Sequence, residues 1–145
     1  MPRLLLLAAF IWLTFLLLPV FASQGDTSYP HIAYHVIAIP ILIGALVILG
    51  RLRAARRTNT QTVFAWILTV TVSLCTLGHI AELVVAVIRF AEDGFANRDT
   101  ADVWEHGPHL WAANVTIPST FLSMLVVLAL VITAAIQNRH RLESV

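Results

Sequence analysis

The chain contains no lysine, a single cysteine and few charged residues of either sign. Nine arginines stand against eight acidic residues, a net charge of +1, so the chain lacks the global basic field that nucleic-acid binding needs. Because Cys75 is alone, an intrachain disulfide, a CxxC redox pair and a cysteine-rich zinc or iron–sulfur site are excluded. Any metal chemistry must therefore rest on histidine and carboxylate side chains.

Apolar residues dominate what is present. Of the 145 residues, 59% are hydrophobic and only 12% are charged, and the mean hydropathy is +0.84. This apolar surplus is far beyond what one soluble core of this size could bury, so a soluble domain is excluded. The composition instead predicts an all-α integral membrane protein.

Four apolar runs set the expected architecture. Residues 1–22 carry Arg3 ahead of an apolar stretch and end in small residues, which is typical of a cleavable signal peptide. Alternatively the stretch stays as a first transmembrane helix, since about 18 residues at 1.5 Å each nearly span the ~30 Å hydrocarbon core. Further transmembrane helices are predicted at about 32–50, 63–88 and 115–136. We expect one membrane domain over residues 23–145, a bundle of three helices after signal removal or four if the first is retained.

The charges predict the orientation of these helices. The loop 51–62 is rich in arginine without any acid, whereas the loop 91–112 is acidic and the tail after residue 136 is again basic. By the positive-inside rule, the C-terminus is cytoplasmic, and residue 23 and the loop 91–112 lie on the outer side of a bacterial-type inner membrane. The residues read as a topology signal and anionic-lipid contact are Arg51, Arg53, Arg56 and Arg57.

Histidines gather on the outer side of this topology. Only His140 falls on the inner tail, and the other five are His31, His35, His79, His106 and His109. From 1.5 Å per residue, His35, His79 and Glu82 lie about 9, 5 and 10 Å outward of the bilayer centre, in roughly one layer. His31 and His35 are four residues apart and His79 and Glu82 three apart, so each pair shares a helix face.

Imidazole and carboxylate at one-turn spacing predict a site for a transition metal such as Cu, Zn or Fe. We expect His35, His79 and Glu82 as ligands, joined by His31 and by His106 and His109 from a Gly-Pro turn in the outer loop. Residues in supporting roles would be Asn114, Thr116 and Arg89. A b-type haem held by His35 and His79, serving electron transfer, is the alternative cofactor. Metal handling or membrane redox chemistry at the outer face would follow, and whether the chain is an enzyme stays open.

Other functions are compatible with the same residues. The chain could be a non-catalytic accessory subunit whose polar residues make interhelical contacts with other membrane subunits or with a second copy. Proton conduction through His79 and Glu82 is a third hypothesis, although the inner half of that helix offers few polar groups. Cys75 is interpreted as a small apolar filler near the bilayer centre, so Cys75→Ser should leave metal occupancy intact.

Histidine ligation predicts a pH dependence. Neutral imidazole is the ligand form, so metal binding should weaken as the pH falls through about 6 to 7, the ordinary titration range of histidine. Equilibrium binding of the metal between pH 8 and pH 5 measures this effect. A flat profile over that range would show that histidines are not the ligands.

Overall fold

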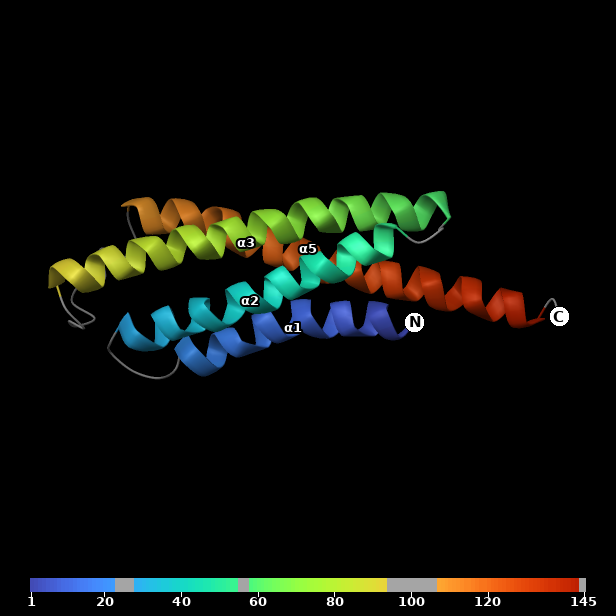
Figure 1. Ribbon diagram of the computed structural model, residues 1–145, viewed down its shortest axis with the longest axis horizontal. Helices are drawn as coiled ribbons and strands as arrows, with labels where there is room; N and C mark the ends of the chain where they lie inside the picture. Colours follow the sequence, from blue (N-terminus) through green and yellow to red (C-terminus); the bar gives the residue numbers. More distant parts are fainter. Residues whose placement is uncertain (23–27, 55–57, 94–106, 144–145) are drawn as a thin grey trace.

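The computed structural model describes residues 1–22, 28–54, 58–93 and 107–143, and 97% of this part of the chain is helical. The helices are α1 (Pro2–Ala22), α2 (Ser28–Arg53), α3 (Asn59–Asp93) and α5 (Gly107–Glu143). Successive helices run in opposite directions along an elongated bundle, and both chain termini lie at the same end (Figure 1). We call the other end, which holds Ala22, Ser28, Asp93 and Gly107, the site end.

The residues at the helix starts explain where the helices begin. Pro2, Pro30 and Pro108 each lie in a first turn, where proline fits because its missing N–H has no intrahelical acceptor there. Gly107, which opens α5, has a φ of 74°, a conformation that glycine adopts without steric cost. At the start of α3, the hydroxyl of Thr58 accepts a hydrogen bond from the Gln61 backbone N–H at 3.4 Å.

The helices extend beyond the apolar runs that predicted them. α2 continues through Arg53, so two arginines of the predicted loop 51–62 are helical, and α5 begins at Gly107, so His109 is helical rather than part of a loop. The reason is that an apolar run marks the stretch suited to lipid, whereas backbone hydrogen bonding continues into polar residues with adequate helix propensity. Arg56, Arg57 and His106 lie outside the described residues.

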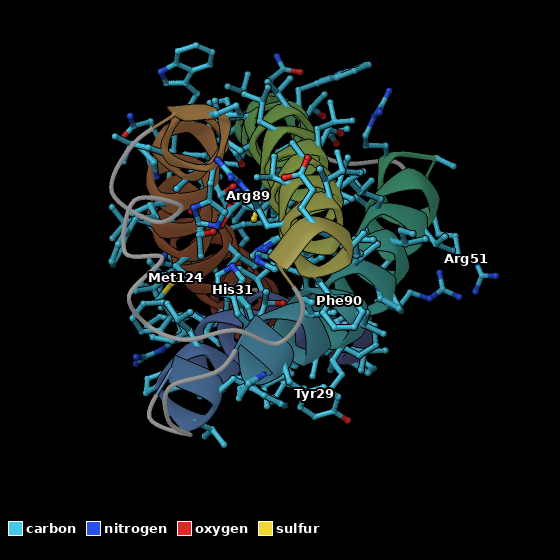
Figure 2. All side chains as sticks on the ribbon, turned by 90° about the vertical axis from the view of Figure 1, so that its left-hand side faces the viewer. Tyr29, His31, Arg51, Arg89, Phe90 and Met124 are labelled. Carbon is cyan, nitrogen blue, oxygen red and sulfur yellow. The ribbon has the colours of Figure 1, made fainter. Side chains whose placement is uncertain are left out.

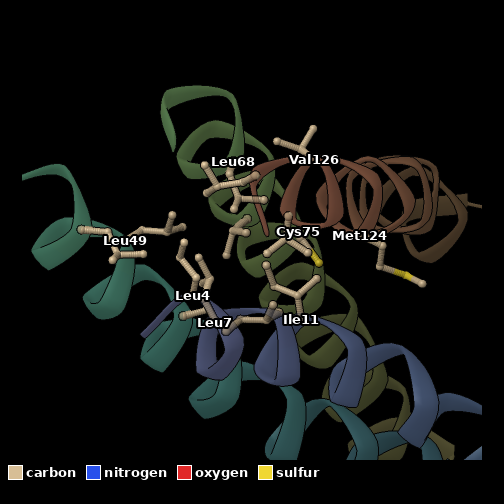
Figure 3. Close-up of a cluster of buried hydrophobic side chains, with 14 of the residues drawn as sticks. Leu4, Leu7, Ile11, Leu49, Leu68, Cys75, Met124 and Val126 are labelled. Atoms are coloured by element: carbon tan, nitrogen blue, oxygen red, sulfur yellow. The ribbon is translucent and has the colours of Figure 1, made fainter. Parts of the chain in front are cut away.

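The interior of the bundle is built from one buried line of side chains on each helix. Four helix pairs pack extensively: α1 with α2, α2 with α3, α3 with α5, and α1 with α5. α2 and α5 are therefore diagonal neighbours. Figure 3 shows the apolar part of the core, to which all four helices contribute. Its members include Leu4, Leu7 and Ile11 of α1, Leu49 of α2, Leu68 and Cys75 of α3, and Met124 and Val126 of α5.

The outer surface of the bundle is apolar. Large hydrophobic side chains are exposed on every helix, among them Leu16, Ile43, Leu77 and Leu125. All four helices are long and apolar enough to cross a membrane. This includes α1, whose buried residues Leu4, Leu7 and Ile11 belong to the core that all four helices share.

A close contact between α3 and α5 depends on a glycine. A Cβ atom at Gly78 would overlap the Thr116 hydroxyl and would lie 3.2 Å from the Thr116 Cα. Because one of these atoms is backbone, a larger side chain at position 78 requires the two helices to move apart. Four residues further along α3 comes Glu82, so this contact sets how near α5 lies to that carboxylate.

Candidate metal site

Ionisable side chains from three helices meet inside the bundle close to its site end. α2 contributes His31 and His35, α3 contributes His79 and Glu82, and α5 contributes His109 from its first turn. In Figure 2, which looks onto the site end, His31 lies in the middle of the bundle between these helices. The periodicity that placed each pair on one helix face is what directs them to a common point.

Four donor atoms converge at this point. The Nε2 atom of His31 is 2.8 Å from the Nε2 of His35 and 3.1 Å from the Nε2 of His109. The Oε2 atom of Glu82 is 3.4 Å from the Nε2 of His109 and 3.7 Å from the Nε2 of His35. Each of His31, His35, Glu82 and His109 offers one ligand atom, and these four atoms all lie within 4.8 Å of one another.

These separations suit a four-coordinate metal site. For metal–ligand bonds of about 2.0–2.1 Å, the ligand atoms of a tetrahedral Zn²⁺ site lie about 3.3 Å apart. Four of the six separations among the donor atoms, 2.8, 3.1, 3.4 and 3.7 Å, are distributed on both sides of that value, and the other two are no more than 4.8 Å. An ion at the centre would therefore need only small shifts of the side chains.

Because most of the cluster is buried, a charge on its side chains is costly in free energy. His35, Glu82 and His109 are buried, with 1%, 5% and 5% of their surface exposed, and His31 is half-buried at the side nearest the site end. Among the described residues, Glu82 is the only buried acidic one. A carboxylate removed from water is costly unless a positive charge or several hydrogen bonds compensate it. A bound cation would supply that compensation, with the three imidazoles as its further ligands.

His79 lies beside the four converging donors. Its Nδ1 atom is 2.9 Å from the Nδ1 of His35, on the side of that ring opposite the Nε2 that faces the cluster. Ligating histidines commonly donate their second ring N–H to a neighbouring acceptor, which fixes the tautomer and the ring orientation. The structure thus gives His79 the geometry of a group that orients His35, whereas the sequence predicted it as a direct ligand.

The position of His79 yields a graded prediction. His79→Ala removes the acceptor for the His35 Nδ1–H, so metal affinity should fall about 10- to 100-fold while the stoichiometry at saturating metal stays unchanged. His79→Gln, which retains an acceptor, should recover part of the affinity. Metal titration of both variants measures this, and loss of stoichiometric binding in His79→Ala would instead identify His79 as a ligand.

The other predicted site residues are placed differently. Thr116 is buried beside Glu82, with which its side chain is in hydrogen-bonding contact, and its hydroxyl donates to the Ala112 carbonyl at 3.0 Å. Asn114 is exposed. Arg89, labelled in Figure 2, is exposed as well and pairs with Glu92 at 3.9 Å, so the structure does not bring it into the cluster. His106 lies outside the described residues.

A polar seam between α3 and α5 leads inward from the site. The Cys75 thiol lies 3.0 Å from the Thr120 hydroxyl, and one turn deeper Ser123 donates to the Thr71 hydroxyl at 2.9 Å. Beyond this level the buried residues are apolar, namely Leu68, Val127 and Leu130. The polar stripes of the two helices thus face each other within the chain, and the seam ends in an apolar core. Cys75 is buried in the apolar core and has polar contacts to Thr120 and Ser119 of α5.

Tyr34 packs against the site from within α2. It is buried, and its ring centroid lies 5.2 Å from that of His35 and 5.4 Å from that of His79. Its hydroxyl donates to the Thr14 carbonyl of α1 at 3.1 Å. The signal available in the sequence was its position next to His35, which does not by itself indicate which way a tyrosine points. Through Tyr34, α1 supports a site to which it gives no ligand.

Comparisons with protein-family models, with curated proteins and with solved structures found no match for this chain. The chemistry of the site has therefore to be deduced from its own donor atoms and their surroundings. These are three imidazole nitrogens and one carboxylate, held in a largely water-excluded setting between three helices.

Proposed function

We propose that this protein is an integral membrane protein that binds a divalent transition-metal ion, Zn²⁺ in the first instance, near one face of the bilayer. The ligands are the Nε2 atoms of His31, His35 and His109 and a carboxylate oxygen of Glu82. The observation that carries the proposal is the convergence of these four atoms, which all lie within 4.8 Å of one another. Membrane insertion is supported by four apolar helices with apolar outer faces.

The ligand set favours a bare metal ion over haem. A b-type haem needs a flat slot between its two axial histidines. His35 and His79, the pair expected to hold it, are instead in direct Nδ1 contact, with ring centroids 5.1 Å apart. Histidine and carboxylate suit Zn, Cu and Fe, and a four-coordinate tetrahedral arrangement is the one Zn²⁺ prefers.

Four protein ligands favour metal binding or handling over hydrolysis. Catalytic zinc sites usually keep one coordination position for water or substrate, whereas closed sites use four protein ligands. Three of the proposed ligands are buried and only His31 is half-buried. A metal ion would therefore enter and leave the site past His31, at the site end. By the positive-inside rule, the Arg-rich connection between α2 and α3 is cytoplasmic, which makes the site end the outer one.

The test is to purify the full chain in mild detergent and to measure Fe, Cu, Zn and Mn together with the ultraviolet-visible spectrum. One metal ion per chain without a Soret band supports the proposal, and a Soret band would replace it with a haem protein. If the folded protein contains and takes up no metal, the proposal fails. Migration as part of a larger complex would then support the accessory-subunit alternative.

A further inference from the structure

The end of the bundle opposite the site end carries a second feature, a cavity of about 440 Å³ between the last turn of α2 and the first turns of α3. Its size falls in the range typical of small-ligand sites, about 300–1,000 Å³. The lining residues are Gly50, Arg53, Ala54, Thr62, Ala65 and Trp66. None of them takes part in the metal site.

One cation is held in place at this cavity. The guanidinium carbon of Arg53 lies 3.3 Å from the centroid of the Trp66 ring, a cation–π contact that holds the guanidinium group over the indole. In the part of the chain that the structure describes, no carboxylate pairs with Arg53. Arg51 is exposed in the same turn, and the sequence from 51 to 62 holds no acid at all. The cavity is thus lined by the guanidinium group of Arg53, which stacks on Trp66 and whose N–H donors no described carboxylate occupies.

We propose that this cavity binds the phosphate group of an anionic phospholipid. A planar guanidinium matches a phosphate with paired hydrogen bonds, and tryptophan favours the level of the lipid headgroups. The surrounding surface suits the acyl chains, since Val47, Val63 and Ile67 are exposed on the adjoining faces of α2 and α3. The inference rests on the membrane part of the proposed function and is independent of the metal.

Lipid binding to the purified full chain tests this directly. We expect native mass spectrometry of delipidated protein to show tighter binding of phosphatidylglycerol than of phosphatidylcholine. Arg53→Gln should weaken the binding of phosphatidylglycerol about five- to tenfold. Gly50→Leu should weaken it too, because a Cβ at Gly50 meets nothing within 4 Å and the larger side chain extends into free space beside the cavity.

Arg139→Gln is the matched control. Arg139 lies near the C-terminus of α5, at the same end of the bundle, and its side chain is exposed and already paired with Glu143 at 2.8 Å. Its loss should leave lipid binding unchanged. The proposal would be overturned if phosphatidylglycerol and phosphatidylcholine bound equally well. It would also be overturned if Arg53→Gln and Arg139→Gln lost the same amount of phosphatidylglycerol affinity, which would indicate unspecific charge attraction. Full competition by inorganic phosphate would also overturn it, because a free anion would then suffice.

Two separate readouts distinguish failure of this proposal from failure of the metal proposal. Vesicle flotation reports whether the chain inserts into lipid at all, and chains that float without discriminating between lipids refute the lipid site alone. Metal content should be the same in Arg53→Gln and the unmodified chain, since Arg53 lies at the end of the bundle opposite the metal ligands.

Discussion

Glu82→Gln is expected to abolish stoichiometric metal binding while leaving the bundle folded. Glutamine keeps the size of the side chain but removes the only buried carboxylate among the described residues, and with it the charge that offsets the cation. Loss of a group that only orients a ligand costs about 10- to 100-fold in affinity, so loss of a direct ligand should cost more than about 100-fold. Metal titration and elemental analysis of the purified variant measure this.

A thermal shift separates a lost ligand from a lost fold. A ligand present at about 100 times its Kd stabilises a folded protein by about 2.7 kcal/mol, so saturating Zn²⁺ should raise the melting temperature of the unmodified protein. Glu82→Gln should melt near the metal-free protein and show no such rise. Cys75→Ser is the matched control and should retain the full shift, because Cys75 contacts Thr120 and not the donor cluster. If Glu82→Gln still responds to metal, the carboxylate is not a ligand.

Gly78→Val is expected to weaken metal binding although residue 78 has no ligand atom. Its Cβ would overlap the Thr116 side chain, so α3 and α5 must separate, and with them Glu82 and His109. Overpacking of this kind costs about 1–3 kcal/mol, which exceeds the gain of less than about 1 kcal/mol from replacing glycine in a helix. We therefore expect a lower melting temperature in detergent and a metal affinity reduced about tenfold or more.

Gly50→Val provides the control for this effect. It makes the same chemical change in a helix, but a Cβ at Gly50 meets nothing within 4 Å. The melting temperature should therefore stay the same or rise slightly, and metal affinity should not change. If Gly78→Val behaved like Gly50→Val, the close approach of α3 and α5 would not be what positions the ligands.

The helices were predictable because the apolar runs are long and contain few charges, which gather in the stretches between them. Each apolar run corresponds to a helix, but the helices begin earlier and end later than predicted. An apolar run marks the stretch suited to contact with lipid, whereas backbone hydrogen bonding continues beyond it. α5 gained eight residues before the predicted start at 115, and these include His109. This extension is what turns an expected loop residue into a ligand held by a helix.

The site was predictable in part. Spacing placed His31 with His35 and His79 with Glu82 on shared faces, and the structure buries Cys75, His79, Glu82 and Ala86 along one stripe of α3. Spacing within one helix does not fix how far that helix is rotated against its neighbour. Because of that rotation, the Glu82 carboxylate faces the donor cluster. His79 instead contacts the Nδ1 atom of His35, on the side of the ring that faces away from the cluster.

Spacing within one helix also does not predict where Arg89 and Asn114, two residues expected in supporting roles, lie relative to the site. Arg89 continues the stripe of Glu82 in the sequence, yet it lies one and a half to two turns closer to the end of a long helix, where it is exposed and pairs with Glu92. Periodicity alone does not show where packing against the neighbouring helices ends. Asn114 likewise precedes the polar stripe of α5 but faces outward.

The contact between His31 and His109 joins α2 and α5, which are diagonal neighbours rather than one of the four extensively packed pairs. A metal ion at this point would be a cross-link across the diagonal of the bundle, coordinated by three helices at once. Occupancy would then hold the site-end turns of α2 and α5 at a fixed separation, which the packing of these two helices against each other does little to determine.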